Sequence, residues 1–172
     1  MLAGSMLWWV HLDAEDYKII MRQFLFVLSF FLPLTALCQI IGKVVSIADG
    51  DTFTMLVDNT QIKIRLHGID CPEKGQDFGN VAKEFLSGLV FGKVVSVDDM
   101  DTDRYGRTIG MVMIDGMNAN EELLKAGLAW HYKTYDKNPA WAQYEVTARE
   151  RKKGLWFQPN AIPPWEWRKG RR

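Results

Sequence analysis

Short β-forming segments separated by turn residues constrain the fold of this chain more than any other feature of its sequence. Segments 40–47 and 52–57 are rich in β-forming residues and flank Asp49-Gly50-Asp51, so together they predict a β-hairpin. In segment 61–66 aliphatic residues alternate with polar ones, which places the aliphatic side chains on one face of a strand and Arg65 on the other. These three segments are therefore predicted to be consecutive strands.

A single amphipathic helix is predicted to interrupt the strands. Between Gly79 and Val90 the apolar residues Val81, Phe85 and Leu89 lie four positions apart. This is the spacing of a helix that packs one stripe of side chains on a core. We therefore expect Val81, Phe85 and Leu89 to face the core.

Two further strands are predicted at 93–97 and 107–114, and helices at about 120–125 and 140–152. Because segment 107–114 is almost continuously apolar, this strand is expected to be buried on both sides. Five short strands with one helix between the third and the fourth, followed by more helices, predict an α+β fold that is mainly β. The expected architecture is a five-stranded OB-fold Greek-key barrel with about three packed helices.

The N-terminal region has the profile of a secretory signal. An apolar run, Phe24 to Leu37, follows the basic residue Arg22 and contains Pro33. This run is too short to span a bilayer comfortably. The small residues Ala36 and Cys38 precede Gln39, so cleavage before Gln39 is expected, with export to the periplasm or the medium and membrane contact only during export.

Two alternatives concern the same region. Acidic residues precede Met21 where a signal should be basic, which favours Met21 as the natural start of a shorter chain. A lipid anchor on Cys38 is the competing localisation, although the large residue Leu37 stands where a small one is expected. The predicted organisation is an extension and signal peptide at 1–38, one domain at 39–160 and a basic tail at 161–172.

Composition and charge exclude little. The chain of 172 residues is 48% apolar and 24% charged, which is typical of one compact domain, and it contains no repeat or long linker. Its formal net charge is zero, so net charge alone does not indicate a polyanionic partner. Basic residues concentrate between Arg149 and Arg172, a pattern that is typical of a solvated helix face followed by a basic tail.

Cysteine and histidine are scarce. After cleavage before Gln39 the chain would keep Cys71 as its one cysteine, and His67 and His131 as its histidines. This supply excludes a disulfide framework and a zinc cage built from Cys and His. Any metal ion must therefore be held by oxygen atoms.

Charged residues that could carry chemistry gather in three segments: DGDT at 49–52, RLHGIDCPE at 65–73 and DRYGR at 103–107. Each also has a simpler interpretation. The first is common hairpin-turn chemistry, the third can be a solvated loop, and Arg65 can pair with Asp70 or Glu73 on the surface. Two acids and an arginine at the end of one strand nevertheless favour a functional site.

Taken together, these segments resemble the thermonuclease family of staphylococcal nuclease-like domains, and the resemblance covers nearly all of residues 40–160. The segments NEELLKAGLAW at 120–130 and KKGLW at 152–156 belong to the same pattern. The resemblance implies an OB-fold barrel and hydrolysis of DNA or RNA with Ca²⁺. It also implies a role for each matching residue: Asp51 and Asp70 as metal ligands, Cys71 as a ligand through its backbone carbonyl, Glu73 as general base, and Arg65 and Arg107 as exposed ligands of the phosphate.

The resemblance places nucleotide contacts on Tyr105 and on Arg104, which stands where the family has a lysine, with Tyr132 and Tyr135 as further candidates. A short link at 74–78 replaces a long loop of the family between Glu73 and the helix. We therefore predict a monomeric, calcium-dependent nuclease with no stable protein partner. The alternative is a catalytically weak or inactive OB-fold module that binds nucleic acid or protein.

Overall fold

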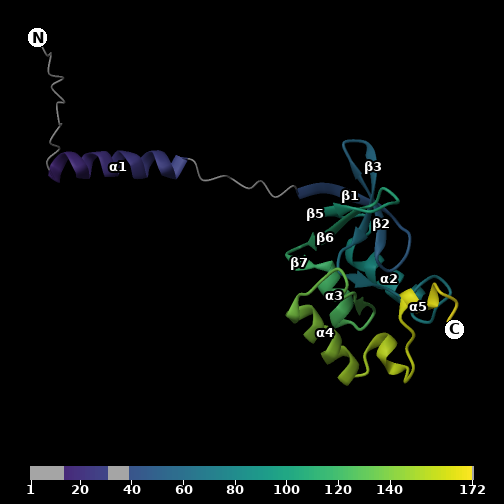
Figure 1. Cartoon of the computed structure of the whole chain (residues 1–172). Coiled ribbons are helices and arrows are strands. Elements are labelled where there is room, and N and C mark those ends of the chain that lie inside the picture. The colour runs from purple at the N-terminus through teal and green to yellow at the C-terminus, as the bar shows by residue number, and fades with distance from the viewer. Residues whose placement is uncertain (1–13, 31–38, 172) are drawn as a thin grey trace, which may run out of the picture. The chain divides into compact units, whose positions relative to one another are not determined.

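A computed structural model describes residues 14–30 and 39–171 of the chain (Figure 1). The chain divides into two units, Met1–Ala36 and Leu37–Arg172. The described part of the first unit is helix α1, Ala14–Phe30. Across the described residues, no helix combines the length and the apolar character needed to cross a membrane. The predicted cleavage and lipidation positions, Ala36 and Cys38, lie outside the described residues.

The second unit contains a closed barrel of five strands. Strands β1 (Gln39–Ile47), β2 (Thr52–Val57) and β3 (Thr60–Leu66) pair antiparallel in sequence order, as the turn signals predict. Strand β5 (Val94–Thr102) pairs with β1 and with β6 (Thr108–Ile114). The parallel pairing of β3 with β6 closes the barrel. The predicted mixed fold with a five-stranded OB-type barrel is therefore confirmed.

The barrel interior is filled by the side chains that alternate along each strand. In β3, for example, Ile64 and Leu66 are fully buried, while Arg65 points to the other face. The other core residues of the five barrel strands are Val44, Phe53, Met55, Val95, Val97, Val112 and Ile114. Full burial of one such side chain stabilises a fold by about 1.5–3 kcal/mol. The alternation of aliphatic and polar residues in the sequence thus determines which face of each strand points into the barrel.

Helix α2 (Gly79–Val90) forms where it is predicted, but its buried stripe is different. The buried side chains are Ala82, Leu86 and Val90, whereas Val81 is 47% exposed. The predicted residues Phe85 and Leu89 are only partly buried at the edge of the core. The predicted and the observed stripe have the same spacing of four residues. The small Ala82 lies in the buried stripe because the chain at Gly50 approaches it closely.

Strands β5 and β6 also differ from the prediction. Strand β5 continues to Thr102, through Asp98, Asp99 and Asp101, with an irregular register between the last two. Its acidic half is mostly exposed, so these polar side chains stay in contact with water and extend the strand at little cost in free energy. Strand β6 is not buried on both sides, because buried residues alternate with half-buried ones along it.

Helices α3 (Ala119–Lys125) and α4 (Pro139–Glu150) confirm the two predicted C-terminal helices, and Figure 1 shows them together below the barrel. Asn118 and Asn138 cap their N-termini by accepting backbone N–H groups. The fully buried Asn120 ties α3 to the barrel, because its amide accepts from Val112 N–H at 3.1 Å and donates to two backbone carbonyls.

Five short elements complete the fold. Strand β4 (Ile69–Asp70) pairs with β8 (Trp130–His131), and β7 (Met117–Asn118) extends the sheet beside β6. A 3-10 turn, η1 (Gly154–Phe157), follows α4, and the helical turn α5 (Pro164–Trp167) lies near the C-terminus. The β4–β8 pair matters most for function, since it fixes Asp70.

Candidate active site

The ends of β2, β3 and β4 bring Asp51, Arg65 and Asp70 together. Thr52 pairs with Arg65 in the sheet, and Leu66 N–H donates to the carbonyl of Asp51 at 2.9 Å. Gly68 then turns the chain with φ of 67°, a conformation that glycine adopts without strain. The turn returns Asp70 toward Arg65.

The Arg65 guanidinium bridges the two carboxylates. Its Nη2 donates to Asp70 Oδ1 at 2.7 Å, and its Nη1 pairs with Asp51 Oδ1. The side chains of Arg65, Asp51 and Asp70 are 14%, 7% and 1% exposed. Arg65 was expected to be an exposed phosphate ligand, but the buried carboxylates draw it into the domain. Its pairing with Asp70 is a buried contact rather than a surface one.

Cys71 is packed beneath the turn that carries Asp51. Its backbone N–H donates to Asp51 Oδ2 at 2.7 Å, and its thiol donates to the carbonyl of Gly50 at 3.3 Å. The side chain is 3% exposed. Burial raises the pKa of the Cys71 thiol well above its usual value, with Arg65 opposing the shift. The thiol is therefore protonated at neutral pH.

The DRYGR segment forms a tight loop around Asp103. Asp103 Oδ1 accepts the backbone N–H groups of Tyr105 and Arg107 at 2.8 and 3.0 Å, and Oδ2 accepts Arg107 Nε at 2.6 Å. Burial alone would raise the pKa of Asp103, but these hydrogen bonds lower it. Arg107 Nη1 also reaches Thr52 Oγ1 at 3.5 Å, next to Asp51, so the loop joins the same site.

Tyr105 is the most open aromatic ring among the predicted nucleotide contacts, at 69% exposure. The Arg104 guanidinium lies 4.8 Å from its ring centre and donates to its hydroxyl at 2.7 Å. The Arg107 guanidinium lies 5.7 Å from the same centre. Two cations and one ring thus lie together, and Arg107 connects them to Thr52, the residue after Asp51.

The other two tyrosines are placed differently. Tyr135 is 67% exposed, but the ring of Tyr132 is stacked on Trp165 at 5.2 Å and 10°. One face of Tyr132 is therefore covered. Trp130, for which the sequence leaves core and site open, is 8% exposed and packs edge-on against Trp156 and Trp165. Trp130 belongs to a second hydrophobic cluster.

Arg168 contacts the candidate site although it lies in the predicted basic tail, residues 161–172. Its Nη2 lies 2.8 Å from Asp70 Oδ2, and its Nη1 lies 2.5 Å from Glu73 Oε1. Partial burial lowers the pKa of Arg168, but the two carboxylates outweigh this effect and raise it. The spacing of residues in the sequence does not distinguish Arg168 from the neighbouring basic residues. The aromatic pair Trp165 and Trp167 is the one available sign that this segment packs on the domain.

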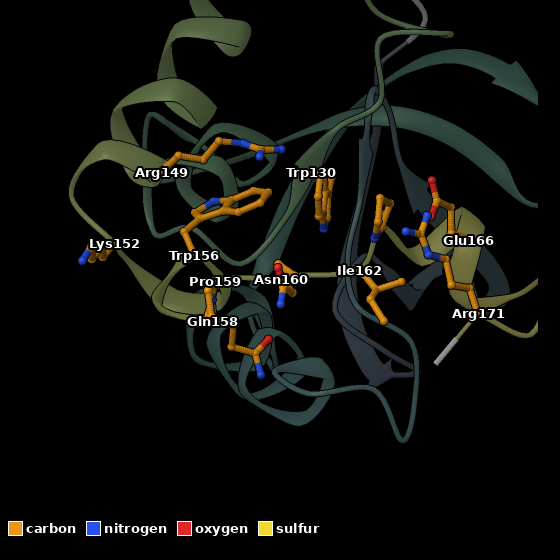
Figure 2. Close-up of a pocket in the computed structure, with 12 residues that line it drawn as sticks. Trp130, Arg149, Lys152, Trp156, Gln158, Pro159, Asn160, Ile162, Glu166 and Arg171 are labelled. Carbon is orange, nitrogen blue, oxygen red and sulfur yellow. The ribbon is translucent and has the colours of Figure 1, made fainter.

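A cavity of about 690 Å³ lies between α4, η1 and the C-terminal residues (Figure 2). The Arg149 guanidinium lies 3.7 Å from the ring centre of Trp156 and 4.5 Å from that of Trp130 at its wall. None of the predicted catalytic or metal-binding residues lines this cavity. The candidate catalytic and metal-binding residues therefore lie at the strand ends and not in the cavity.

The donors at the strand ends suit only one kind of metal ion. In the described ranges, no group of three or more His, Cys, Asp or Glu side chains is arranged to hold a metal ion. Asp51 and Asp70 share Arg65 and could supply two carboxylates, with a backbone carbonyl of Cys71 as a further protein donor. Such a set fits a hard cation that keeps much of its water, because the protein supplies few ligands and all are oxygen.

Comparison with known proteins identifies the family of the chain. A family described as staphylococcal nuclease homologue matches residues 63–158. An uncharacterized endonuclease of Escherichia coli O157:H7 is 40% identical over 150 residues, which cover 86% of this chain and 98% of the relative. A micrococcal nuclease of Shigella flexneri is 43% identical over 140 residues, 74% of this chain and 80% of the relative. The chain therefore belongs to the staphylococcal nuclease homologue family and is a hydrolase of the phosphodiesterase type.

Proposed function

We propose that the protein is a calcium-dependent nuclease that hydrolyses phosphodiester bonds of DNA, RNA or both through water activated by Glu73. The observation that supports this most is the buried Asp51–Arg65–Asp70 cluster, with Arg107 connected to it through Thr52. A cluster of acids and arginines at the ends of strands suits a reaction in which negative charge grows on a phosphate.

Asp51, Asp70 and the Cys71 carbonyl would hold the ion. Calcium fits them because it accepts oxygen ligands in irregular geometry and tolerates several waters. When bound, the ion supplies positive charge that polarises the phosphate and acidifies a water molecule. The almost complete burial of Asp70 fixes its carboxylate before any ion binds, since β4 and Arg65 both restrain it.

Arg65 and Arg107 would bind the scissile phosphate. Their planar guanidinium groups match phosphate oxygens and remain charged at every relevant pH. An interaction of this kind that tightens in the transition state is worth roughly 3–4 kcal/mol when it is removed. Asp103 orients Arg107 through two hydrogen bonds to its side chain and backbone, which leaves part of the guanidinium for substrate.

Glu73 would take the proton of the attacking water, a contribution of about 100- to 10,000-fold in rate. Its side chain is 35% exposed, so water reaches it. Gln76 accepts the backbone N–H of Glu73 at 3.0 Å, which restrains the short link after the strand. The carboxylate therefore stands beside Asp70 on a restrained loop.

Nucleotide bases would stack on Tyr105, with Arg104 close to its ring, and on Tyr135. Tyr132 is the weaker contact because Trp165 covers one of its faces. Stacking of this kind carries little sequence preference, which suits the hydrolysis of varied nucleic acids. In this proposal the protein acts as a monomer without a stable protein partner.

We also propose that the protein is exported and begins at Gln39 after cleavage, so that it acts in the periplasm or the medium. The apolar run from Phe24 to Leu37 and the small residues Ala36 and Cys38 support this localisation. A lipid anchor through Cys38 remains the alternative.

Nuclease assays distinguish this proposal from an inactive binding module. Purified protein is incubated with plasmid DNA in calcium, in excess chelator, and in chelator followed by added calcium. We expect hydrolysis in the first and third samples only. DNA binding without hydrolysis in all three would favour the module, and full activity in excess chelator would exclude the metal-dependent reaction.

A further inference from the structure

The C-terminal segment, residues 158–171, is connected to the short loop that carries Glu73. Gln158 Nε2 donates to Asp77 Oδ2 at 2.7 Å, and Gln76 Nε2 donates to the carbonyl of Ile162 at 2.6 Å. Because Gln76 also accepts the Glu73 N–H, the C-terminal segment restrains the backbone of Glu73 through one intermediate side chain.

Aromatic packing holds the far part of the C-terminal segment. Trp165 lies edge-on to Trp130 at 5.5 Å and is stacked on Tyr132 at 5.2 Å. Pro164 is buried at the start of α5, and Arg168 N–H donates to its carbonyl at 3.0 Å. Since Trp165 and Arg168 are three residues apart on a helical turn, they project to the same side. Packing of the ring therefore sets the position of the guanidinium.

The Arg168 guanidinium joins two carboxylates that the proposed reaction uses. It binds Asp70 Oδ2 at 2.8 Å and Glu73 Oε1 at 2.5 Å. Asp70 Oδ1 is at the same time held by Arg65. In the described part of the chain, Arg168 forms the one ion pair of the Glu73 carboxylate. Each carboxylate oxygen has two lone pairs. Asp70 Oδ1 accepts from Arg65 and also from Arg168 Nη1 at 3.3 Å, so the acceptor site left for an ion is on Asp70 Oδ2, and Glu73 keeps acceptor sites for water.

We propose that Arg168 is a positioning residue of the nuclease: its planar fork fixes the Glu73 carboxylate relative to Asp70, and the C-terminal segment holds Arg168 in place beside them. The inference rests on the proposed function, in which Asp70 binds the ion and Glu73 activates water. A fork that binds two acids at once restrains their separation, which a single point charge does not. Displacement of a reacting group by about 1 Å can cost about 100-fold in rate.

The first test separates turnover from binding. The variants Arg168→Ala and Arg168→Lys are compared with Arg171→Ala, a matched control that removes a cation of the same segment paired with Glu166. On single-stranded DNA at saturating calcium, we expect Arg168→Ala to lose about 10- to 100-fold in kcat with KM within about threefold. Arg168→Lys should recover part of the loss, and Arg171→Ala should match the parent.

The second test asks whether Arg168 acts through Glu73. If it does, Arg168→Ala should cause little further loss of kcat when it is added to Glu73→Gln. Calcium affinity is measured by calorimetry on the same proteins, and we expect a change within about threefold for Arg168→Ala. Thermal melts followed by circular dichroism serve as the folding control. Arg168→Lys keeps the test valid if the alanine variant unfolds.

The outcomes separate the two levels of the proposal. A parent protein without calcium-dependent activity, or an active Glu73→Gln, would contradict the proposed function itself. In an active enzyme, parental kcat for Arg168→Ala would overturn the positioning role alone. A rise in kcat together with tighter calcium binding would also overturn it, because the guanidinium would then be an inhibitor that competes with the ion.

Discussion

The Asp51 carboxylate accepts the backbone N–H of Cys71 at 2.7 Å, which connects the turn before β2 to the residue that follows β4. The other oxygen of Asp51 pairs with Arg65. Asp51 is 5% exposed, so both contacts are shielded from water. One buried carboxylate therefore stabilises the fold and supplies the proposed ion site, and substitutions can separate the two roles.

Substitution of Asp51 tests this separation. We expect Asp51→Asn and Asp51→Ala both to abolish calcium-dependent hydrolysis, because each removes the charge. Asn keeps an oxygen acceptor for the Cys71 N–H, whereas Ala leaves that buried donor unsatisfied and should lower the free energy of unfolding by a further ~1–3 kcal/mol. Urea unfolding and initial rates measure the two effects, with Asp70→Ala as a second inactive variant. Full activity of Asp51→Asn would refute the ligand role.

The two candidate phosphate arginines should respond differently to removal. Arg107→Ala is expected to lose roughly 100-fold or more in turnover while the protein remains folded, because its side chain is 26% exposed. Arg65→Ala should also lose stability, since it leaves the buried Asp51 carboxylate without its cation and leaves Asp70 with Arg168 alone. Breaking a buried ion pair costs about 3–5 kcal/mol. Circular dichroism checks the fold, and an unfolded Arg107→Ala would indicate a structural role for Arg107.

The barrel could be predicted from the sequence because alternation and turn residues are local properties of a strand. The motif segments likewise named Asp51, Arg65 and Asp70, which the structure brings together. Tertiary packing decided the rest. The buried stripe of α2 depends on the close approach of Gly50 to Ala82, and this contact has no signature in the helix itself. The place of Arg168 depends equally on distant residues, since Trp165 positions it by packing against the region after α3.

The localisation proposal has a direct test. If the apolar run is a signal, N-terminal sequencing of protein recovered outside the cytoplasm should begin at Gln39. A Cys38→Ser variant serves as the control, because a lipid anchor requires the thiol and signal cleavage does not. Release of the variant from a membrane fraction that retains the parent would support the anchored alternative. Full-length protein confined to the cytoplasm would contradict export.

Cys71 lies between two acids of the candidate site, yet its side chain should be dispensable for hydrolysis. Burial raises the pKa of its thiol, so the thiolate that a nucleophile requires is scarce at pH 7 and becomes populated only well above pH 9. The thiol is directed at the carbonyl of Gly50, and a hard cation prefers the backbone oxygen that every residue carries.

We therefore expect Cys71→Ala and Cys71→Thr to keep initial rates on single-stranded DNA within about tenfold of the parent, while Glu73→Gln loses about 100-fold or more. In the folded parent, maleimide labelling of Cys71 should stay slow between pH 7 and 9 and become rapid after denaturation, since burial protects the thiol. If both Cys71 variants are folded but inactive while Glu73→Gln is active, thiol chemistry accounts for the reaction better than water activated by Glu73.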